Sequence, residues 1–302
     1  LGDLLRDLGE HTAARAQLER SVAVLTPIAA KAPLALAAAL NNLSRLHQQH
    51  GDWTEARQSL ERAQQLRLKV LKSPHPDLVL GLNNLGMLAL SQGDLKRARG
   101  HLEHALDQAR QLDGDSGILA LQIANLARVD SDAGQLPQAI QRLKQAQTIF
   151  DNQLGDDHPS SLNNLAELLL VQQRHGDREE LLPPLQRLLR ARFALLTDQA
   201  WRLSPRERLL LLRRRDPSWY LADALAETNP EAAELALALR LSSQGLLQEL
   251  QREQRLLLQS PSAAEGAAEP LASRWIEPTE IAAVLPSDGA LIELKRYLNP
   301  AQ

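Results

Sequence analysis

The sequence predicts an all-α solenoid of antiparallel helical hairpins, because three marks recur in one register about every 42 residues. The first mark is a glycine, and the steps between successive glycines are 42, 42, 41 and 42 residues. An Asn-Leu pair precedes most of these glycines, and an Ala-x3-Leu-x2-Ala pattern follows most of them. The glycines are Gly9, Gly51, Gly93, Gly134 and Gly176. Stacked hairpins of this kind bind other macromolecules along an extended surface.

Each repeat is expected to contain two helices that proline and glycine delimit. In residues 76–117, Pro76 fits a helix start, because it cannot continue a preceding helix and is tolerated at the first helical position. A first helix is predicted at Leu78–Ser91 and a second at Leu95–Leu112, with Gly93-Asp94 as the turn. One hairpin cannot bury the apolar faces of both helices, so neighbouring repeats must stack.

The fourth repeat is expected to be irregular. The predicted repeats span about 34–75, 76–117 and 118–155, with a fourth beginning near Asp156. The chain begins within a repeat, so the first repeat is expected to lack half of its first helix. Pro159 precedes Asn164 by five residues, whereas Pro76 precedes Asn84 by eight. The first helix of the fourth repeat is therefore expected to be displaced by nearly one turn.

The repeat marks fade after residue 177, and a different organisation follows. Helix starts are predicted at Ser204-Pro205, Asp216-Pro217 and Asn229-Pro230, and the aromatic residues Trp201, Trp219 and Tyr220 are expected in the core of this part. A strand is predicted at Ala290–Tyr297, as the beginning of a further domain. The expected domains are a solenoid at 1–190, a helical extension at 191–259, a linker at 260–277 and the start of an α/β domain at 278–302.

Composition excludes several classes of function. The net charge is −3, and the pI is about 6.3, so nothing indicates a nucleic acid or an anionic membrane as partner. No apolar run approaches the roughly 20 residues that span a bilayer. The chain has no cysteine, which excludes disulfides and a cysteine nucleophile within these residues and fits the cytoplasm. No phosphate-binding glycine loop or Ser-His-Asp set is present, so we expect neither catalysis nor a cofactor in this chain.

The hairpin marks resemble the tetratricopeptide repeat. The Asn-Asn-Leu-Gly element at 83–86 and the His-Pro-Asp element at 75–77 look like the longer, roughly 42-residue type found in kinesin light chains. The resemblance covers about residues 1–190 and implies a right-handed superhelix that binds a protein or peptide segment. The chain departs from this pattern at Ala89 and Leu102, where such repeats often carry a large aromatic residue.

The C-terminal part resembles a second pattern. In bacterial proteins that join these repeats to a CHAT domain, a caspase-like cysteine protease, similar helices follow the repeats. Here the matching segments are Glu231–Leu237 and Leu285–Glu293, the second of which resembles the first strand of a CHAT domain. The resemblance implies that a CHAT-like domain lies downstream as an intramolecular partner. The catalytic His and Cys of that family have no counterpart within these residues.

A row of asparagines is the sharpest candidate site, and we call it the Asn ladder: Asn42, Asn84, Asn125 and Asn164. The ladder recurs once per repeat on the first helix, which lines the concave groove of such solenoids. An amide both donates and accepts hydrogen bonds, so a row of amides can hold an extended peptide backbone without reading its sequence. Capping or bridging of neighbouring helices is the alternative. For the doubled partners Asn41, Asn83 and Asn163, a structural role is favoured, although Asn41 and Asn83 are kept among the candidate groove residues.

The residues one turn beyond the ladder are candidates for the same groove. The ladder is flanked in the outer repeats by Arg45, Gln49, Arg128 and Asp132. In the middle repeat the apolar residues Met87 and Leu90 take the place of these charges. Mixed charge around an apolar centre would suit an amphipathic segment. An ordinary solvated helix face remains the alternative.

The histidines are expected to be structural or exposed. His47 and His50 stand three residues apart, as do His101 and His104, a spacing that can place two imidazoles toward a metal ion. No third ligand stands at suitable spacing, so surface positions are favoured and no metal is expected. A histidine precedes the prolines at 76 and 159, where it is expected to serve the turn.

The sequence thus predicts a protein–protein interaction module. The first reading is that a protein segment lies in the concave groove and that the module is the sensor or regulatory arm of a CHAT protease. A passive scaffold or oligomerisation arm is the main alternative. An enzyme and a nucleic-acid solenoid are disfavoured by the missing catalytic set, the pI and the scarcity of aromatic residues.

Overall fold

The computed structural model describes residues 11–112, 116–177, 181–202, 217–226 and 231–239, together with Ser242. The regular structure within these ranges is helical, with no strand among the described residues. The chain divides into two compact units, residues 1–164 and residues 165–302, and the division falls inside helix α9 (Pro159–His175). The predicted all-α class is confirmed, whereas the predicted end of the solenoid near residue 190 stays a prediction.

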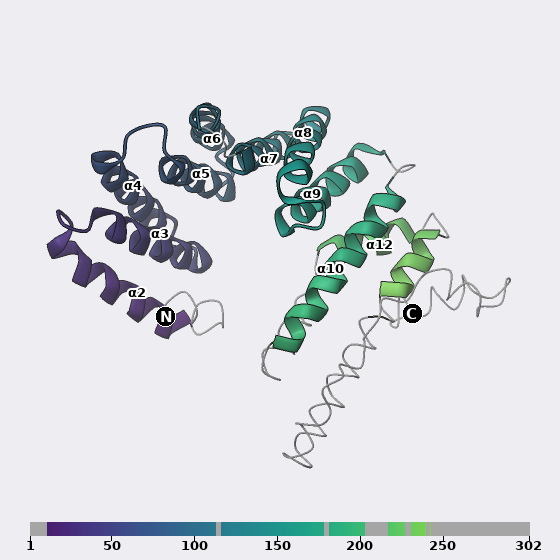
Figure 1. Ribbon diagram of the computed structural model, residues 1–302, viewed down its shortest axis with the longest axis horizontal. Helices are drawn as coiled ribbons and strands as arrows, with labels where there is room; N and C mark the ends of the chain where they lie inside the picture. Colours follow the sequence, from purple (N-terminus) through teal and green to yellow (C-terminus); the bar gives the residue numbers. More distant parts are fainter. Residues whose placement is uncertain are drawn as a thin grey trace, which may run out of the picture. The chain divides into compact units, whose positions relative to one another are not determined.

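Unit 1 is built of successive helical hairpins, seen side by side in Figure 1. In each complete repeat the first helix, helix A, packs antiparallel against the second, helix B. The helices in chain order are α2 (His11–Leu25), the short η1 (Thr26–Ile28), α3 (Pro33–His50), α4 (Trp53–Val70), α5 (Pro76–Ser91), α6 (Leu95–Ala109), α7 (Ser116–Asp132) and α8 (Leu136–Leu154). Helices α3, α5 and α7 are therefore the A helices, and α4, α6 and α8 are their B helices. None of the helices described combines the length and apolar character that crossing a membrane requires.

Each A helix ends at one of the recurring glycines. A left-handed residue after the last turn lets the following N–H groups return to the free carbonyl groups of the helix, and glycine adopts that conformation without steric cost. At Gly93 the φ angle is 74°, and Asp94 N donates to Ala89 O at 3.0 Å. The same arrangement closes α3 and α7, where Asp52 N donates to His47 O and Gln135 N donates to Asp130 O. The predicted turn is confirmed.

The His-Pro elements form helix starts. His75 caps α5, and its Nδ1 accepts a hydrogen bond from Asp77 N at 3.1 Å. His158 Nδ1 accepts from Ser160 N at 3.2 Å at the start of α9. Pro76 and Pro159 each occupy the first helical position, where no N–H is needed. The predicted role of these two histidines in their turns is confirmed.

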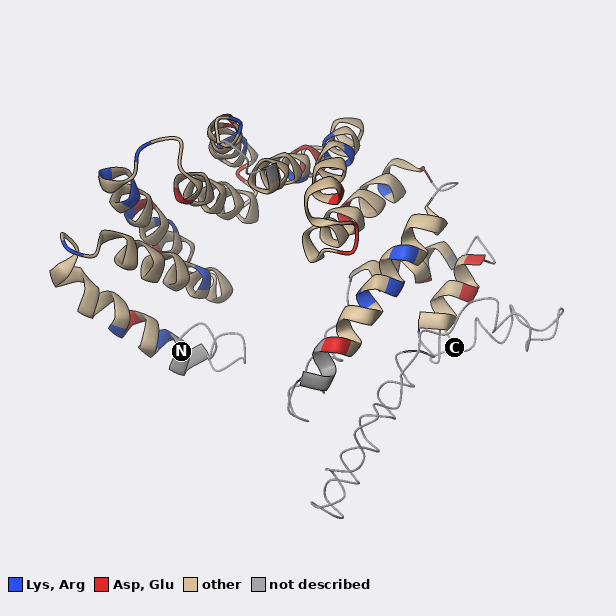
Figure 2. Ribbon diagram, in the orientation of Figure 1, with Lys and Arg blue, Asp and Glu red and all other residues tan. Residues whose placement is uncertain are grey.

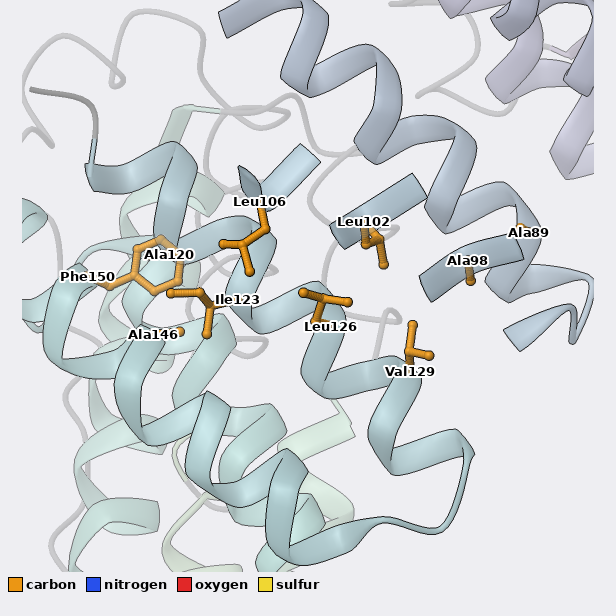
Figure 3. Packing of buried hydrophobic residues seen from close by; sticks show 10 residues of the cluster. All are labelled: Ala89, Ala98, Leu102, Leu106, Ala120, Ile123, Leu126, Val129, Ala146 and Phe150. Carbon is orange, nitrogen blue, oxygen red and sulfur yellow. The ribbon is translucent and has the colours of Figure 1, made fainter. Parts of the chain in front are cut away.

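The core of unit 1 is continuous between repeats, because each B helix packs on its own A helix and on the next one. Figure 3 shows one such cluster, drawn from α5, α6, α7 and α8. Alanines bring the helix axes close, and larger leucines fill the space between hairpins. The cluster consists of Ala89, Ala98, Leu102, Leu106, Ala120, Ile123, Leu126, Val129, Ala146 and Phe150.

One glycine allows an unusually close contact within a hairpin. A Cβ atom placed on Gly86 of α5 would lie 2.7 Å from Cγ of Leu102 on α6 and 3.3 Å from the carbonyl oxygen of Ala98. Leu102 is completely buried, so it has no free space into which to move. Packing against Leu102 therefore requires glycine at position 86.

Unit 2 contains α10 (Leu182–Arg202) and α12 (Pro217–Ala226), which pack together, and a helical segment at 231–239. The predicted helix start at Asp216-Pro217 is confirmed. The predicted burial of Tyr220 is wrong, because that side chain is 54% exposed. Leu221, Ala222 and Leu225 form the buried stripe of α12, and Tyr220 lies off that stripe.

Several predictions fall outside the described residues. They include the helix start at Ser204-Pro205, the linker at 260–277, the segment at 278–302 and its strand at Ala290–Tyr297. The helix predicted to start at Asn229-Pro230 is described only at 231–239.

Candidate functional site

The three A helices of unit 1 present one common surface, which we call the A-helix face. It consists of the side chains of α3, α5 and α7 that remain exposed or partly exposed after the hairpins have packed, together with the buried Asn125 in the same row as Asn42 and Asn84. Residues at equivalent positions of the repeats form rows across the three helices. The rows are Ala38, Leu80 and Leu121; then Asn42, Asn84 and Asn125; then Arg45, Met87 and Arg128; then Gln49, Ser91 and Asp132.

Hydrogen bonds between asparagines hold the A helices in this register. Asn84 Nδ2 on α5 donates to Asn41 Oδ1 on α3 at 2.6 Å. Asn125 Nδ2 on α7 donates to Asn83 Oδ1 on α5 at 2.6 Å. Asn83 Nδ2 in turn lies 3.5 Å from Asn84 Oδ1. Asn41 and Asn83 therefore have the structural role that was favoured for them, since each accepts a bond from the following repeat, and for Asn163 that role stays a prediction.

The ladder residues differ in how accessible they remain. Asn42 and Asn84 are half-buried, and Asn42 Oδ1 lies 3.4 Å from Nη2 of the exposed Arg45. Asn125 is only 5% exposed, because its side chain lies between α5 and α7. Bridging of helices, the alternative weighed for the ladder, is thus the observed state of Asn84 and Asn125. Contact with a ligand stays a prediction for the whole set.

Asn164 does not continue the row. Its Nδ2 donates to Leu143 O at 2.9 Å and to Gln147 Oε1 at 2.8 Å, both on α8, and the residue is 4% exposed. The reason is the displacement expected for this helix, because α9 begins at Pro159, only five residues before the asparagine. Counted from the His-Pro element, Glu167 takes the position that Asn84 occupies in α5.

The A-helix face carries little charge. Charged side chains concentrate on the B helices, as the blue and red segments of α4 show in Figure 2, whereas α5 has Asp77 as its single charged residue. Two leucines of this face are exposed, Leu34 at 41% and Leu80 at 37%. Arg45, Gln49 and Asp132 are exposed at its margins, and Arg128 is half-buried. The face therefore combines amides with apolar groups and has charges toward one side.

A buried ion cluster connects three helices at the junction between the second and third complete repeats. Asp130 on α7 is 1% exposed, and its carboxylate accepts from Arg99 Nη2 on α6 at 2.8 Å and from Arg142 Nη1 on α8 at 2.7 Å. Sequence reasoning missed this cluster. The available signal was an arginine six residues after each of the first three glycines, at Arg15, Arg57 and Arg99.

The histidine pairs do not form metal sites within the described residues, where no group of three or more potential ligands gathers. His47 is buried, and its Nδ1 lies 3.5 Å from Asp52 Oδ2. His104 Nε2 lies 3.0 Å from Gln108 Nε2. Burial lowers the pKa of His101, an effect that the carboxylate of Glu61 partly offsets. The predicted surface position is therefore wrong for His47, which is buried beside Asp52.

The repeat resemblance is supported by comparison with known proteins. The tetratricopeptide-repeat family model matches residues 1–69 and 35–111. A comparison with curated proteins found no match. With the geometry above, the chain is an all-α, tetratricopeptide-like helical solenoid.

Solved structures place the solenoid near kinesin-light-chain-like repeats. One similar crystal structure is that of the nearly identical TPR-like repeats of a putative kinesin light chain from Podosopora anserina. Its sequence is 26% identical, the TM-score is 0.52, and the match covers 62% of this chain and 89% of the other. BtubC (BKLC) from P. vanneervenii is 18% identical, with a TM-score of 0.57, and the match covers 87% of this chain and 95% of BtubC. A Rap protein complexed with Competence and Sporulation Factor is 15% identical, with a TM-score of 0.56, over 83% and 74%. The last two likenesses concern the fold alone.

Proposed function

We propose that this protein is a protein–protein interaction module and that it holds an extended or helical segment of a partner across the A-helix face of unit 1. The observation that carries the proposal is the registration of three A helices by asparagine pairs, which aligns weakly charged rows into one surface. Tetratricopeptide repeats are stacked hairpins, and such solenoids use extended surfaces for binding. The Rap protein was solved with a bound factor, which agrees with such a use of the fold.

The composition of the face favours a partner segment with mixed character. Leu34 and Leu80 offer exposed apolar contacts, and Asn42 and Asn84 offer amide groups beside them. Arg45 stands at the charged margin. An amphipathic segment would place its apolar side chains over the row of Ala38, Leu80 and Leu121. Its backbone or polar groups would then lie over the asparagine amides. The concave groove predicted from the sequence is the setting we propose for this contact.

Site-specific cross-linking tests the proposal with a matched control. A photoreactive amino acid at position 80, in place of Leu80, reports on contacts with the A-helix face. The control carries the same group in place of Leu68, which is 57% exposed on the B helix α4 and lies outside that face. In cells that make the protein, we expect a discrete partner to cross-link from position 80 and to be lost when Met87 is changed to Glu. Equal cross-linking from both positions would contradict the proposal.

We further propose that the module regulates a CHAT-like protease. The support is the resemblance of Glu231–Leu237 and Leu285–Glu293 to the corresponding segments of such proteins. The test compares substrate cleavage by the whole protein and by a variant that lacks the solenoid. Partner-dependent cleavage that disappears with the solenoid is expected, and equal cleavage by both forms would refute the coupling. That result would leave partner binding to the A-helix face intact as a separate proposal.

A further inference from the structure

A cavity of about 300 Å³ lies at the junction between the first and second complete repeats, where α4, α5 and α6 meet. Its apolar wall comes from α5, and its polar wall comes from the two B helices on either side. It is distinct from the amide rows of the A-helix face. The lining residues are Arg57, Glu61, Leu85, Leu88, Ala89, Gln92, Arg97 and His101.

The repeat register identifies what this cavity lacks. At the next junction, Asp130 lies between Arg99 and Arg142. Arg99 stands six residues after Gly93. Asp130 stands four residues before Gly134, and Arg142 stands eight residues after Gly134. The residues at the same three positions of the cavity junction are Arg57, Ala89 and His101. The two basic groups therefore have counterparts, whereas the carboxylate is replaced by a methyl group.

The junction on the other side of the cavity also contains a carboxylate. There Asp52 Oδ2 lies 3.5 Å from His47 Nδ1 and 3.9 Å from Arg15 Nη1. Arg15 is the counterpart of Arg57, and His47 is the counterpart of Ala89. At the cavity junction the counterpart of Asp52 is Asp94, which lies 3.4 Å from Arg97, and Arg57 has Glu61 of its own helix at 4.0 Å. The group that the cavity junction lacks is therefore the buried carboxylate of the Asp130 position, where Ala89 stands.

We infer that this cavity binds a carboxylate supplied by another molecule, with Arg57 and His101 in the roles that Arg99 and Arg142 have toward Asp130. A carboxylate can accept several charge-assisted hydrogen bonds, and arginine fits it in a bidentate manner. Leu85 and Leu88 close the apolar side of the cavity and accommodate the carbon atoms that carry the group. The ligand class is an acidic peptide, contributing either an aspartate side chain or a C-terminal carboxylate.

The existing ion pairs of the cavity leave room for such a ligand. Arg57 Nε lies 4.0 Å from Glu61 Oε1, and Arg97 Nε lies 3.4 Å from Asp94 Oδ2. Both distances exceed those of the two pairs at Asp130, and the four side chains are more than a third exposed. Exposed pairs of this geometry contribute little, so a carboxylate held inside the cavity can compete with them. Removal of the competing Glu61 carboxylate should strengthen binding.

Binding should also depend on pH through His101. Burial lowers the pKa of the free imidazole, Glu61 acts in the opposite sense, and His104 and Arg97 lower it further. A bound carboxylate would stabilise the protonated imidazole and raise that pKa, so binding would take up a proton. The affinity should therefore rise as the pH falls from about 8 to about 6, where the ligand carboxylate stays ionised.

Nuclear magnetic resonance of the full chain labelled in arginine and histidine tests the inference directly. The probes are acetyl-Gly-Asp-Gly-amide, acetyl-Gly-Gly with a free C-terminus, and acetyl-Gly-Asn-Gly-amide as the uncharged control. We expect one of the two carboxylate peptides to shift Arg57 Nε–Hε and His101, with at least about tenfold weaker binding of the Asn peptide. The active peptide identifies the source of the carboxylate. Shifts from neither carboxylate peptide, or equal shifts from the Asn peptide, overturn the inference.

A second measurement needs no ligand, because the chain can be made to fill its own cavity. Ala89→Asp adds the group found at Asp130, and Ala89→Asn adds the same volume without charge. The Asp variant is expected to unfold at a higher temperature than the Asn variant, and Arg57→Gln should remove that advantage. An Asn variant as stable as the Asp variant would show that the cavity does not favour a carboxylate. Neither variant changes the A-helix face, so failure here leaves the proposed function untouched.

Discussion

Two glycines of the same hairpin should respond in opposite ways to the same substitution. Gly86 lies in α5 and Gly100 in α6, and both are inside helices. A Cβ on Gly86 would lie 2.7 Å from Leu102 Cγ and 2.9 Å from its Cδ2, whereas a Cβ on Gly100 meets nothing within 4 Å. Alanine in place of glycine favours a helix by about 1 kcal/mol at either position. Overpacking of a filled core costs about 1–3 kcal/mol, and only Gly86→Ala incurs it.

The expected free energies of unfolding follow from these two terms. Gly100→Ala should stabilise the protein by about 1 kcal/mol, and Gly86→Ala should destabilise it by up to about 2 kcal/mol. Because the helix term cancels, the difference between the variants measures the packing term alone, about 1–3 kcal/mol. Urea unfolding of the full chain, followed by circular dichroism at 222 nm, provides the measurement. Equal shifts of the two midpoints would refute the close contact between α5 and α6.

Three further predictions concern the polar contacts of unit 1. Asp130→Asn should cost about 1–3 kcal/mol of stability in urea unfolding, less than the loss of a fully buried partner, because Arg99 and Arg142 are each about a third exposed. Asn125→Ala should cost about 1–3 kcal/mol in the same assay, because it leaves the buried Asn83 Oδ1 without its donor. His101 should titrate below its ordinary pKa in a nuclear magnetic resonance titration, and Glu61→Gln should lower that pKa further. Since the folded state then binds fewer protons than the unfolded state, the stability due to His101 should be present above about pH 6.5 and fall below it, and an unshifted titration would contradict this.

The hairpin architecture could be predicted from the sequence because its signals are local. A glycine in the left-handed conformation and a proline at a helix start act on their own neighbours, so Gly93 and Pro76 mark boundaries that the structure reproduces. The second helix of that repeat was predicted to end at Leu112, and it ends at Ala109. The helix has no glycine or proline at its end to stop it, so its last residue was hard to predict, and helix ends commonly fray by a residue or two.

The site could be predicted only in part, because its contacts join residues of different repeats. The sequence showed that asparagines recur, but only the structure shows that Asn84 donates to Asn41 of the preceding repeat. The displacement of α9 was predicted from the position of Pro159, but only the structure shows that it turns Asn164 out of the ladder and onto Leu143 and Gln147 of α8. The Asp130 cluster depends on three helices and leaves no contiguous motif.

The asparagine pairs also give the solenoid a direction. From α7 to α3, the amides form one chain of donors and acceptors, in which Asn125 donates to Asn83, Asn83 approaches Asn84, and Asn84 donates to Asn41. Rotation of one amide would bring two donors or two acceptors together, so the amides can reverse only in concert. A ligand that draws Asn84 away from Asn41 would therefore loosen one repeat junction and disturb the next. The three amide contacts thus tie the junction between α3 and α5 to the junction between α5 and α7.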